Sequence, residues 1–204
     1  MNKSLFLAFL FAFSPIFSME KLPSEYLVKY GDPQAEAKVT EYFSLSCPDC
    51  IKCFIQDFKP IQKEFIDTRK AFWAFHPNPA DLLTLQAMVC LEKLTEKEKI
   101  TFLETVIETL YEQKVFEATN ATSILQITMQ ALGKPIQNLN ELEGIKTTKA
   151  YQNARLYLKQ PDFVQDIPTV EINGKIYDAF PDTKFIKRQL ENLAKQKISK
   201  KAPL

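Results

Sequence analysis

The stretch from Phe43 to Cys50 constrains this chain more than any other, because the hydrophobic period changes across it. Before it, residues 38–43 are rich in β-branched and aromatic types and predict a strand. After it, apolar residues recur at helical spacing as far as Phe65. Cys47 therefore lies where a strand ends and a helix begins. Pro48 suits the first helical position, where a missing N–H costs nothing.

This placement makes Cys47 the predicted N-cap residue, with its sulfur beside free backbone N–H groups. Those groups and the helix dipole favour the thiolate, and cysteines so placed can fall in pKa from about 8.5 to roughly 3.5–7.5. Cys50 follows one turn later, faces inward and can reach back to form a short disulfide. A reactive first sulfur backed by a second is typical of thiol–disulfide exchange.

Composition limits the classes of protein to which the chain can belong. Its 204 residues are 46% apolar and 25% charged, which suits one or two globular domains with a real core. The formal net charge is +1 and no basic block stands out, so no nucleic-acid partner is expected.

The first 18 residues differ from the rest and predict a cleavable signal peptide. A short basic start precedes an apolar run over residues 5–13, and the small residue Ser18 ends the segment. The run is too short to span a bilayer comfortably. Residues 16 and 17 are bulky for a cleavage site, so an uncleaved anchor is the alternative. Four cysteines in an exported chain belong to an oxidising compartment, which disfavours a cytosolic metal site.

The remaining pattern predicts strand–helix–strand, then a block of helices, then a hairpin and a final helix. Pro60 is expected to kink the helix that follows Cys47, and Asn78 with Pro79 predicts the start of the next one. The Lys-rich tail from Lys195 is expected to fray. The predicted strands are 25–30, 38–43, 69–75, 169–172 and 175–177, and the predicted helices are 47–66, a helix from Asn78, one capped by Thr95 and Glu98, 121–132, 150–158 and one capped by Asp182.

Three segments in this order resemble the DsbA-like thiol–disulfide oxidoreductases. The matching segments are residues 39–50, 75–83 and 167–175. The resemblance implies an α/β fold, a thioredoxin-like fold with an inserted α-helical domain. The implied layout is a signal peptide over 1–18, thioredoxin-fold parts over 19–77 and 164–204, and the helical domain over 78–163.

The resemblance also implies roles for individual residues. Cys47 would be the exposed nucleophile and Cys50 the resolving thiol. Pro168 would be a cis-proline facing the disulfide, with the backbone of Ile167 pointed at an incoming peptide that pairs as an added strand. Pro48 and Asp49, between the cysteines, would also contact substrate.

Glu41 lies six residues before Cys47, where this family carries a buried acid. A carboxyl group beneath the disulfide would have a raised pKa and could accept the proton of Cys50. The alternative is a surface glutamate on an edge strand. Val39 and Phe43 on either side favour the buried interpretation.

Three residues depart from the family pattern. Asp49 stands where strongly oxidising members often carry His, and its charge should oppose the Cys47 thiolate and give a milder oxidant. Ile167 stands where DsbA relatives often have Val or Thr. Cys53 replaces a usual aromatic residue and completes a C-x-x-C-x-x-C pattern.

Other interpretations of the cysteines are weaker. An iron–sulfur site lacks its expected fourth cysteine and following proline, and a zinc site would need both His76 and Cys90. Cys53 and Cys90 could form a second disulfide or remain buried thiols. His76, the only histidine, is expected to have an ordinary loop role.

The sequence therefore predicts a periplasmic thiol–disulfide oxidoreductase, a DsbA-like oxidase of moderate potential. It would exchange disulfides with exported cysteine-containing proteins, need no cofactor beyond the Cys47–Cys50 disulfide, and be reoxidised by a DsbB-like membrane partner. A reductase or isomerase of the same fold is the first alternative. A non-catalytic chaperone or binding module is the second, and the intact cysteine pair disfavours it.

Overall fold

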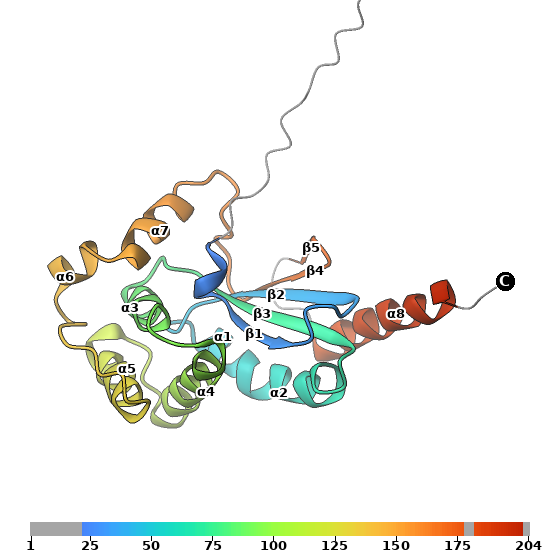
Figure 1. Ribbon diagram of the computed structural model, residues 1–204, viewed down its shortest axis with the longest axis horizontal. Coiled ribbons are helices and arrows are strands. Elements are labelled where there is room, and N and C mark those ends of the chain that lie inside the picture. The colour runs from blue at the N-terminus through green and yellow to red at the C-terminus, as the bar shows by residue number, and fades with distance from the viewer. Residues whose placement is uncertain (1–21, 178–181, 202–204) are drawn as a thin grey trace, which may run out of the picture.

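The computed structural model of the chain describes residues 22–177 and 182–201. The predicted signal peptide, residues 1–18, lies outside the described residues. Within them, a five-stranded sheet forms the centre of the molecule, in the order β1-β3-β2-β4-β5 (Figure 1). The strands are β1 (Val28–Gly31), β2 (Ala37–Phe43), β3 (Ala71–Pro77), β4 (Thr169–Ile172) and β5 (Lys175–Tyr177).

The strand that delivers the cysteines, β2, is central in the sheet. It pairs in parallel with β3 and antiparallel with β4. Parallel neighbours need a crossover connection, and the helical stretch after Cys47 supplies it. The last three residues of β2, from Glu41 to Phe43, are all buried, so the end of the strand that leads to Cys47 is held inside the protein.

The helix predicted from Cys47 to Ile66 is continuous but changes its hydrogen-bond spacing. The α-helical segments α1 (Pro48–Cys53) and α2 (Lys59–Ile61) alternate with the π-helical segments η2 (Phe54–Phe58) and η3 (Gln62–Ile66). A proline removes one backbone donor from the ladder, and π-type spacing is one way a helix absorbs the disturbance. Pro60 lies in α2, between the two π segments.

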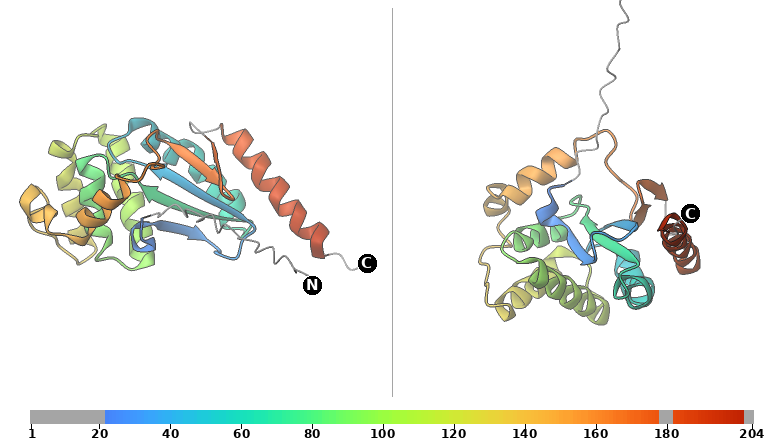
Figure 2. Two further views of the ribbon diagram at one scale, coloured as in Figure 1. Left: turned by 90° about the horizontal axis from the view of Figure 1, so that it is seen from above. Right: turned by 45° about the vertical axis from the view of Figure 1, so that its right-hand side comes forward.

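Five helices follow β3 and precede β4, and they gather at one end of the sheet, opposite the C-terminal helix (Figures 1 and 2). The predicted capping box of Thr95 and Glu98 is confirmed. The predicted start at Asn78 is wrong, because the first of these helices is capped by Asp81. The five are α3 (Leu82–Leu91), α4 (Glu96–Gln113), α5 (Ala118–Ala131), α6 (Leu142–Lys146) and α7 (Lys149–Tyr157).

The C-terminal part follows the sequence pattern closely. The predicted hairpin of β4 and β5 turns at Asn173 and Gly174, both with positive φ, as such a turn requires. Asp182 accepts a hydrogen bond from the backbone N–H of Phe185 at 2.7 Å and caps α8 (Thr183–Lys201). The helix α8 continues past Lys195, where fraying was expected, as far as Lys201.

The N-terminal part differs from the prediction at one place. Residues 25–30 were expected to form one strand, but Ser24–Tyr26 form a short 3₁₀ turn, η1, before β1 starts at Val28. Tyr26 is fully buried in that turn, and its hydroxyl donates a hydrogen bond at 2.7 Å to Glu92, the C-cap residue of α3. This tertiary contact accounts for the turn, since the local pattern alone favours a strand.

A cluster of aromatic side chains holds the cysteine-bearing helix against the sheet. Phe58 contacts Phe75 with ring centroids 4.8 Å apart, Tyr30 at 5.0 Å and Trp73 at 5.4 Å. Phe54 adds a contact with Phe75 at 5.2 Å. Aromatic pairs at these separations add stability beyond the area they bury. Among the residues described, no helix is both long and apolar enough to cross a membrane.

Candidate active site

Cys47 is the N-cap residue of α1, as the sequence predicts. Its Sγ accepts a hydrogen bond from the backbone N–H of Cys50 at 3.2 Å, and Pro48 takes the first helical position. The pKa of the Cys47 thiol is lowered to about 7, first by its hydrogen bond with the Cys50 side chain and then by the backbone N–H groups of Cys50 and Asp49; partial burial opposes them. Cys47 therefore has a large thiolate fraction at neutral pH.

The side chain of Asp49 acts in the expected direction, but weakly. Its negative charge raises the pKa of Cys47, and it is the smallest of the causes that shift this pKa. The backbone N–H of the same residue lowers the pKa and outweighs the charge. The hydrogen bonds that Cys47 accepts from the Cys50 side chain and from the backbone N–H groups of the helix terminus thus outweigh the charge of Asp49.

Cys50 has the opposite environment. It is only 2% exposed, and burial raises the pKa of its thiol far above the ordinary range, with its hydrogen bond to Cys47 as the next cause. Both cysteines are thiols in this structure. The pair is therefore asymmetric, with one accessible thiolate former and one buried thiol that stays protonated while both are reduced.

The segment before β4 lies against the first cysteine. The peptide bond between Ile167 and Pro168 is cis, as the resemblance implies. The carbonyl oxygen of Ile167 lies 4.0 Å from Sγ of Cys47. The structure thus brings together residues that are 120 positions apart in the sequence.

Glu41 is fully buried in the central strand, so the edge-strand alternative is wrong. Its Oε2 accepts a hydrogen bond from the indole N–H of Trp73 at 3.2 Å, and its Oε1 has no partner among the described residues. Burial, ahead of the nearby charges of Asp57 and Cys47, raises the pKa of Glu41 to about 8. A carboxyl group of this kind can hold a proton at neutral pH.

The other cysteines and the histidine lie in unreactive surroundings. Burial raises the pKa of Cys53 and of Cys90 to about 12, and both are thiols. His76 is buried in β3 rather than placed in a loop, and its ring packs against Tyr42 and Tyr157. In the part of the chain that is described, no three His, Cys, Asp or Glu side chains are grouped to hold a metal ion.

The difference in pKa between the cysteines predicts selective alkylation. With a pKa of about 7, Cys47 is roughly half thiolate at pH 7, while Cys53, with a pKa of about 12, has on the order of 10⁻⁵ of its thiol ionised. We expect one equivalent of iodoacetamide at pH 7 to label Cys47 almost alone, as peptide mass spectrometry would show. Comparable labelling of Cys53 would contradict the environment assigned to it.

Residues that the sequence did not indicate also shape this site. Ser44 and Ser46, in the loop before Cys47, donate hydrogen bonds to Asp81 at 2.6 and 2.8 Å. The aspartate follows the serines by more than 30 residues and belongs to a different element. No local pattern in the sequence connects them.

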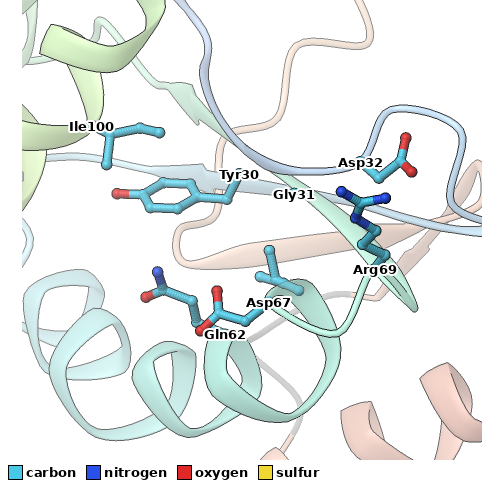
Figure 3. A pocket seen from close by; sticks show the side chains of 8 residues that line it. Tyr30, Gly31, Asp32, Gln62, Asp67, Arg69 and Ile100 are labelled. Carbon is cyan, nitrogen blue, oxygen red and sulfur yellow. The ribbon is translucent and has the colours of Figure 1, made fainter.

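A pocket of about 590 Å³ lies at the other end of the sheet (Figure 3). The residues that line it include Gly31, at the end of β1, and Arg69, just before the start of β3. Because β2 and β3 run parallel and Cys47 follows the end of β2, this pocket is remote from the cysteines. Its lining residues are Tyr30, Gly31, Asp32, Gln62, Ile66, Asp67, Arg69 and Ile100.

Comparison with solved structures identifies the fold. DsbA1 of Wolbachia pipientis (alpha-DsbA1) is 20% identical, with a TM-score of 0.68, over 88% of this chain and 96% of that chain. DsbA of Chlamydia trachomatis is 20% identical, with a TM-score of 0.62, over 82% and 91%. A protein-disulfide isomerase from Novosphingobium aromaticivorans is 16% identical, with a TM-score of 0.62, over 82% and 97%.

Comparison by sequence covers the same region. No curated protein matches the chain. The family model described as thioredoxin matches residues 24–192, which includes every residue of the candidate site. The chain therefore belongs to the thioredoxin family, with the fold of the DsbA-like proteins.

Proposed function

We propose that this protein is a thiol–disulfide oxidoreductase that exchanges disulfides with cysteine-containing proteins. The observation that carries the proposal is the asymmetry of the cysteine pair. Sγ of Cys47 lies at a helix N-terminus, 3.2 Å from a backbone donor and with a pKa of about 7, while Cys50 is buried behind it. A low-pKa sulfur is both a good leaving group and, as a thiolate, a nucleophile.

In the oxidase direction, a substrate thiolate attacks Sγ of Cys47 in the disulfide. The Cys47–Cys50 bond breaks, a mixed disulfide forms, and Cys50 leaves as a thiolate that takes up a proton. A second substrate thiolate then attacks the substrate sulfur of the mixed disulfide and releases Cys47 as a thiolate. The substrate loses two electrons and the enzyme gains them. In the reductase direction the same bonds form and break in reverse order.

The positions of the residues around the cysteine pair suggest their roles in the reaction. Glu41, buried with one free carboxylate oxygen, would exchange the proton of Cys50. The backbone of Ile167 and the ring of Pro168 would contact the substrate chain beside Cys47. Pro48 and Asp49 would form the other side of that contact.

We further propose that the protein works in the periplasm on exported proteins. The predicted signal peptide over residues 1–18 supports export, and the fold shared with DsbA proteins supports this class of substrate. An enzyme that works as an oxidase must be reoxidised, for which a DsbB-like membrane protein is the proposed partner. The redox-active disulfide then replaces any external cofactor.

Reduction of insulin by dithiothreitol tests the basic proposal. We expect the wild-type protein to accelerate insulin precipitation and the Cys47→Ser variant to have no effect above background. Cys90→Ser serves as the matched control, since it removes a buried thiol remote in sequence from the pair, and its rate should equal that of the wild type. Equal rates for wild type and Cys47→Ser would remove the proposed function.

The pKa of Cys47 also predicts the redox potential. A pKa of about 7 resembles the value of about 7 in thioredoxin more than the value of about 3.5 in DsbA. We therefore expect a potential within about −180 to −270 mV rather than near −120 mV, measured by equilibration with glutathione. A disulfide with a potential in this range is a weaker oxidant than the disulfide of DsbA. It therefore favours the reductase or isomerase direction more than a potential of about −120 mV would.

Asp49→His tests the contribution of the side chain between the cysteines. A positive or neutral ring in place of the carboxylate should lower the pKa of Cys47 and raise the potential, because the reduced form gains stability. Asp49→Asn removes the charge alone and should shift both quantities less, in the same direction. Unchanged values in both variants would mean that the Cys50 side chain and the backbone of the helix terminus set the potential without a contribution from Asp49.

A further inference from the structure

A carboxylate on the first helix of the insert holds the loop that precedes Cys47. Asp81 accepts hydrogen bonds from the Ser44 hydroxyl at 2.6 Å, from the Ser46 hydroxyl at 2.8 Å and from the backbone N–H of Thr84 at 2.8 Å. Two of these donors belong to the loop, and the third is the ordinary N-cap bond of α3. One side chain thus caps α3 and ties it to the loop.

The loop has further bonds that depend on the same contact. The backbone N–H of Leu45 donates to Oγ1 of Thr84 at 2.9 Å, and the N–H of Ser46 donates to Oγ of Ser44 at 2.9 Å. The backbone N–H of Cys47 donates to the carbonyl of Ser44 at 3.3 Å. Every backbone donor from residue 45 to residue 47 therefore has a partner supplied by Ser44 or Thr84, two of the three residues that donate hydrogen bonds to Asp81.

These bonds set the conformation from which the reactive sulfur reaches the helix. Cys47 has the extended backbone of an N-cap residue, with φ −97° and ψ 108°, and in that conformation its Sγ accepts the hydrogen bond from the N–H of Cys50. A loop released from Asp81 can rotate about the bonds before Cys47. The contact between Sγ and the N–H would then be formed for a smaller part of the time.

We propose that Asp81 is a positioning residue that fixes the N-cap geometry of Cys47 and so sets the stability of its thiolate. The importance of this role for catalysis rests on the proposed exchange function, whereas the effect of Asp81 on the Cys47 thiolate does not. It acts through geometry, because a carboxylate brought near a thiolate would by its charge oppose the thiolate. The insert thereby takes part in the redox chemistry through one hydrogen-bonded contact with the loop.

Titration of the thiolate absorbance of Cys47 tests the proposal in the reduced full-length protein. We expect Asp81→Ala to raise the pKa of Cys47 by about one unit, which is a tenfold lower acid dissociation constant of the thiol. The equilibrium constant for reduction of the Cys47–Cys50 disulfide by glutathione should fall in parallel, because the reduced form loses stability. Asp81→Asn keeps an oxygen that can accept from the Ser46 hydroxyl and from the N–H of Thr84. The pKa of Cys47 in this variant should therefore stay close to the wild-type value.

Thr95→Ala is the matched control, since it removes the N-cap of α4 without touching the loop. Both alanine variants should lower the melting temperature, but only Asp81→Ala should shift the pKa. If Asp81→Ala melts earlier and keeps the wild-type pKa, the proposal is overturned. If that variant does not fold, Ser46→Ala removes one loop contact and leaves the cap of α3 intact; it should raise the pKa by a smaller amount, and an unchanged value overturns the proposal.

The titration needs no substrate, so its result stands apart from the insulin assay. An inactive wild-type protein would remove the proposed function, while the response of the pKa to Asp81→Ala would still decide the positioning role.

Discussion

Replacement of Cys50 by alanine is expected to change the protein from a catalyst with turnover into a trap for its substrates. Cys47 keeps its helix N-terminus, because the N–H that its Sγ accepts belongs to the backbone of residue 50 and survives the substitution. Its thiolate can still attack a substrate disulfide. The mixed disulfide then lacks the buried thiol that would resolve it, so turnover should fall to background while covalent complexes accumulate. Acid quenching, non-reducing gels and peptide mass spectrometry would identify the linkage at Cys47.

The remaining cysteines provide the controls for this trap. Cys53 lies one turn beyond residue 50, but its pKa of about 12 leaves almost no thiolate to resolve the complex. The double variant Cys50→Ala/Cys53→Ala should therefore trap no more than Cys50→Ala. The Cys47→Ala variant should trap nothing. Complexes formed by Cys47→Ala instead would reverse the roles assigned to the two cysteines.

Glu41→Gln is expected to remove a large pH dependence of stability. The folded protein raises the pKa of this carboxyl from 4.5 to about 8, so the native state binds more protons than the unfolded chain between these two values. The free energy of unfolding must then fall as pH rises from about 4.5 to about 8, by at most about 5 kcal/mol from this group. A buried glutamine does not ionise, so the variant should be the more stable protein above about pH 8.

Urea unfolding of the reduced proteins at several pH values measures this effect. Cys47 titrates with the opposite sign, because its lowered pKa adds stability as pH rises through about 7 to 9. It does so in both proteins, so the difference between wild type and Glu41→Gln isolates Glu41. Glu64→Gln, which alters an exposed ion pair with Lys187, should leave the pH dependence nearly unchanged. Parallel curves for wild type and Glu41→Gln would mean that Glu41 titrates normally.

The features that were predictable from sequence are those with a local cause. Cys47 as N-cap and the turn at Asn173 and Gly174 each depend on residues within a few positions of one another. The burial of Glu41 was also readable, since the apolar residues on either side of it indicate a covered strand. For these elements, short-range sterics and the period of the pattern carry enough information.

The features that were missed have partners far away in the chain. Asn78 is a residue type that commonly caps helices, but its side chain donates a hydrogen bond to the carbonyl of Val164, 86 positions later. Asp81 is the N-cap residue of α3 instead. The bonds of Asp81 to the loop before Cys47, and of Trp73 to Glu41, join different elements in the same way. Side chains that satisfy tertiary partners cannot be assigned until the elements are docked.

The turn of the hairpin is anchored on the start of β2. Oδ1 of Asn173 accepts the N–H of Lys38 at 2.7 Å, its own N–H donates to the Lys38 carbonyl at 2.8 Å, and its side-chain amide donates to the Glu36 carbonyl at 3.0 Å. These bonds close a loop of more than 130 residues that contains the whole block of helices. Loop closure of that length is slow and comes late in folding. Until β4 pairs with β2, one edge of β2 has unpaired backbone N–H and C=O groups. A partly folded chain therefore exposes an aggregation-prone strand edge close to its cysteines.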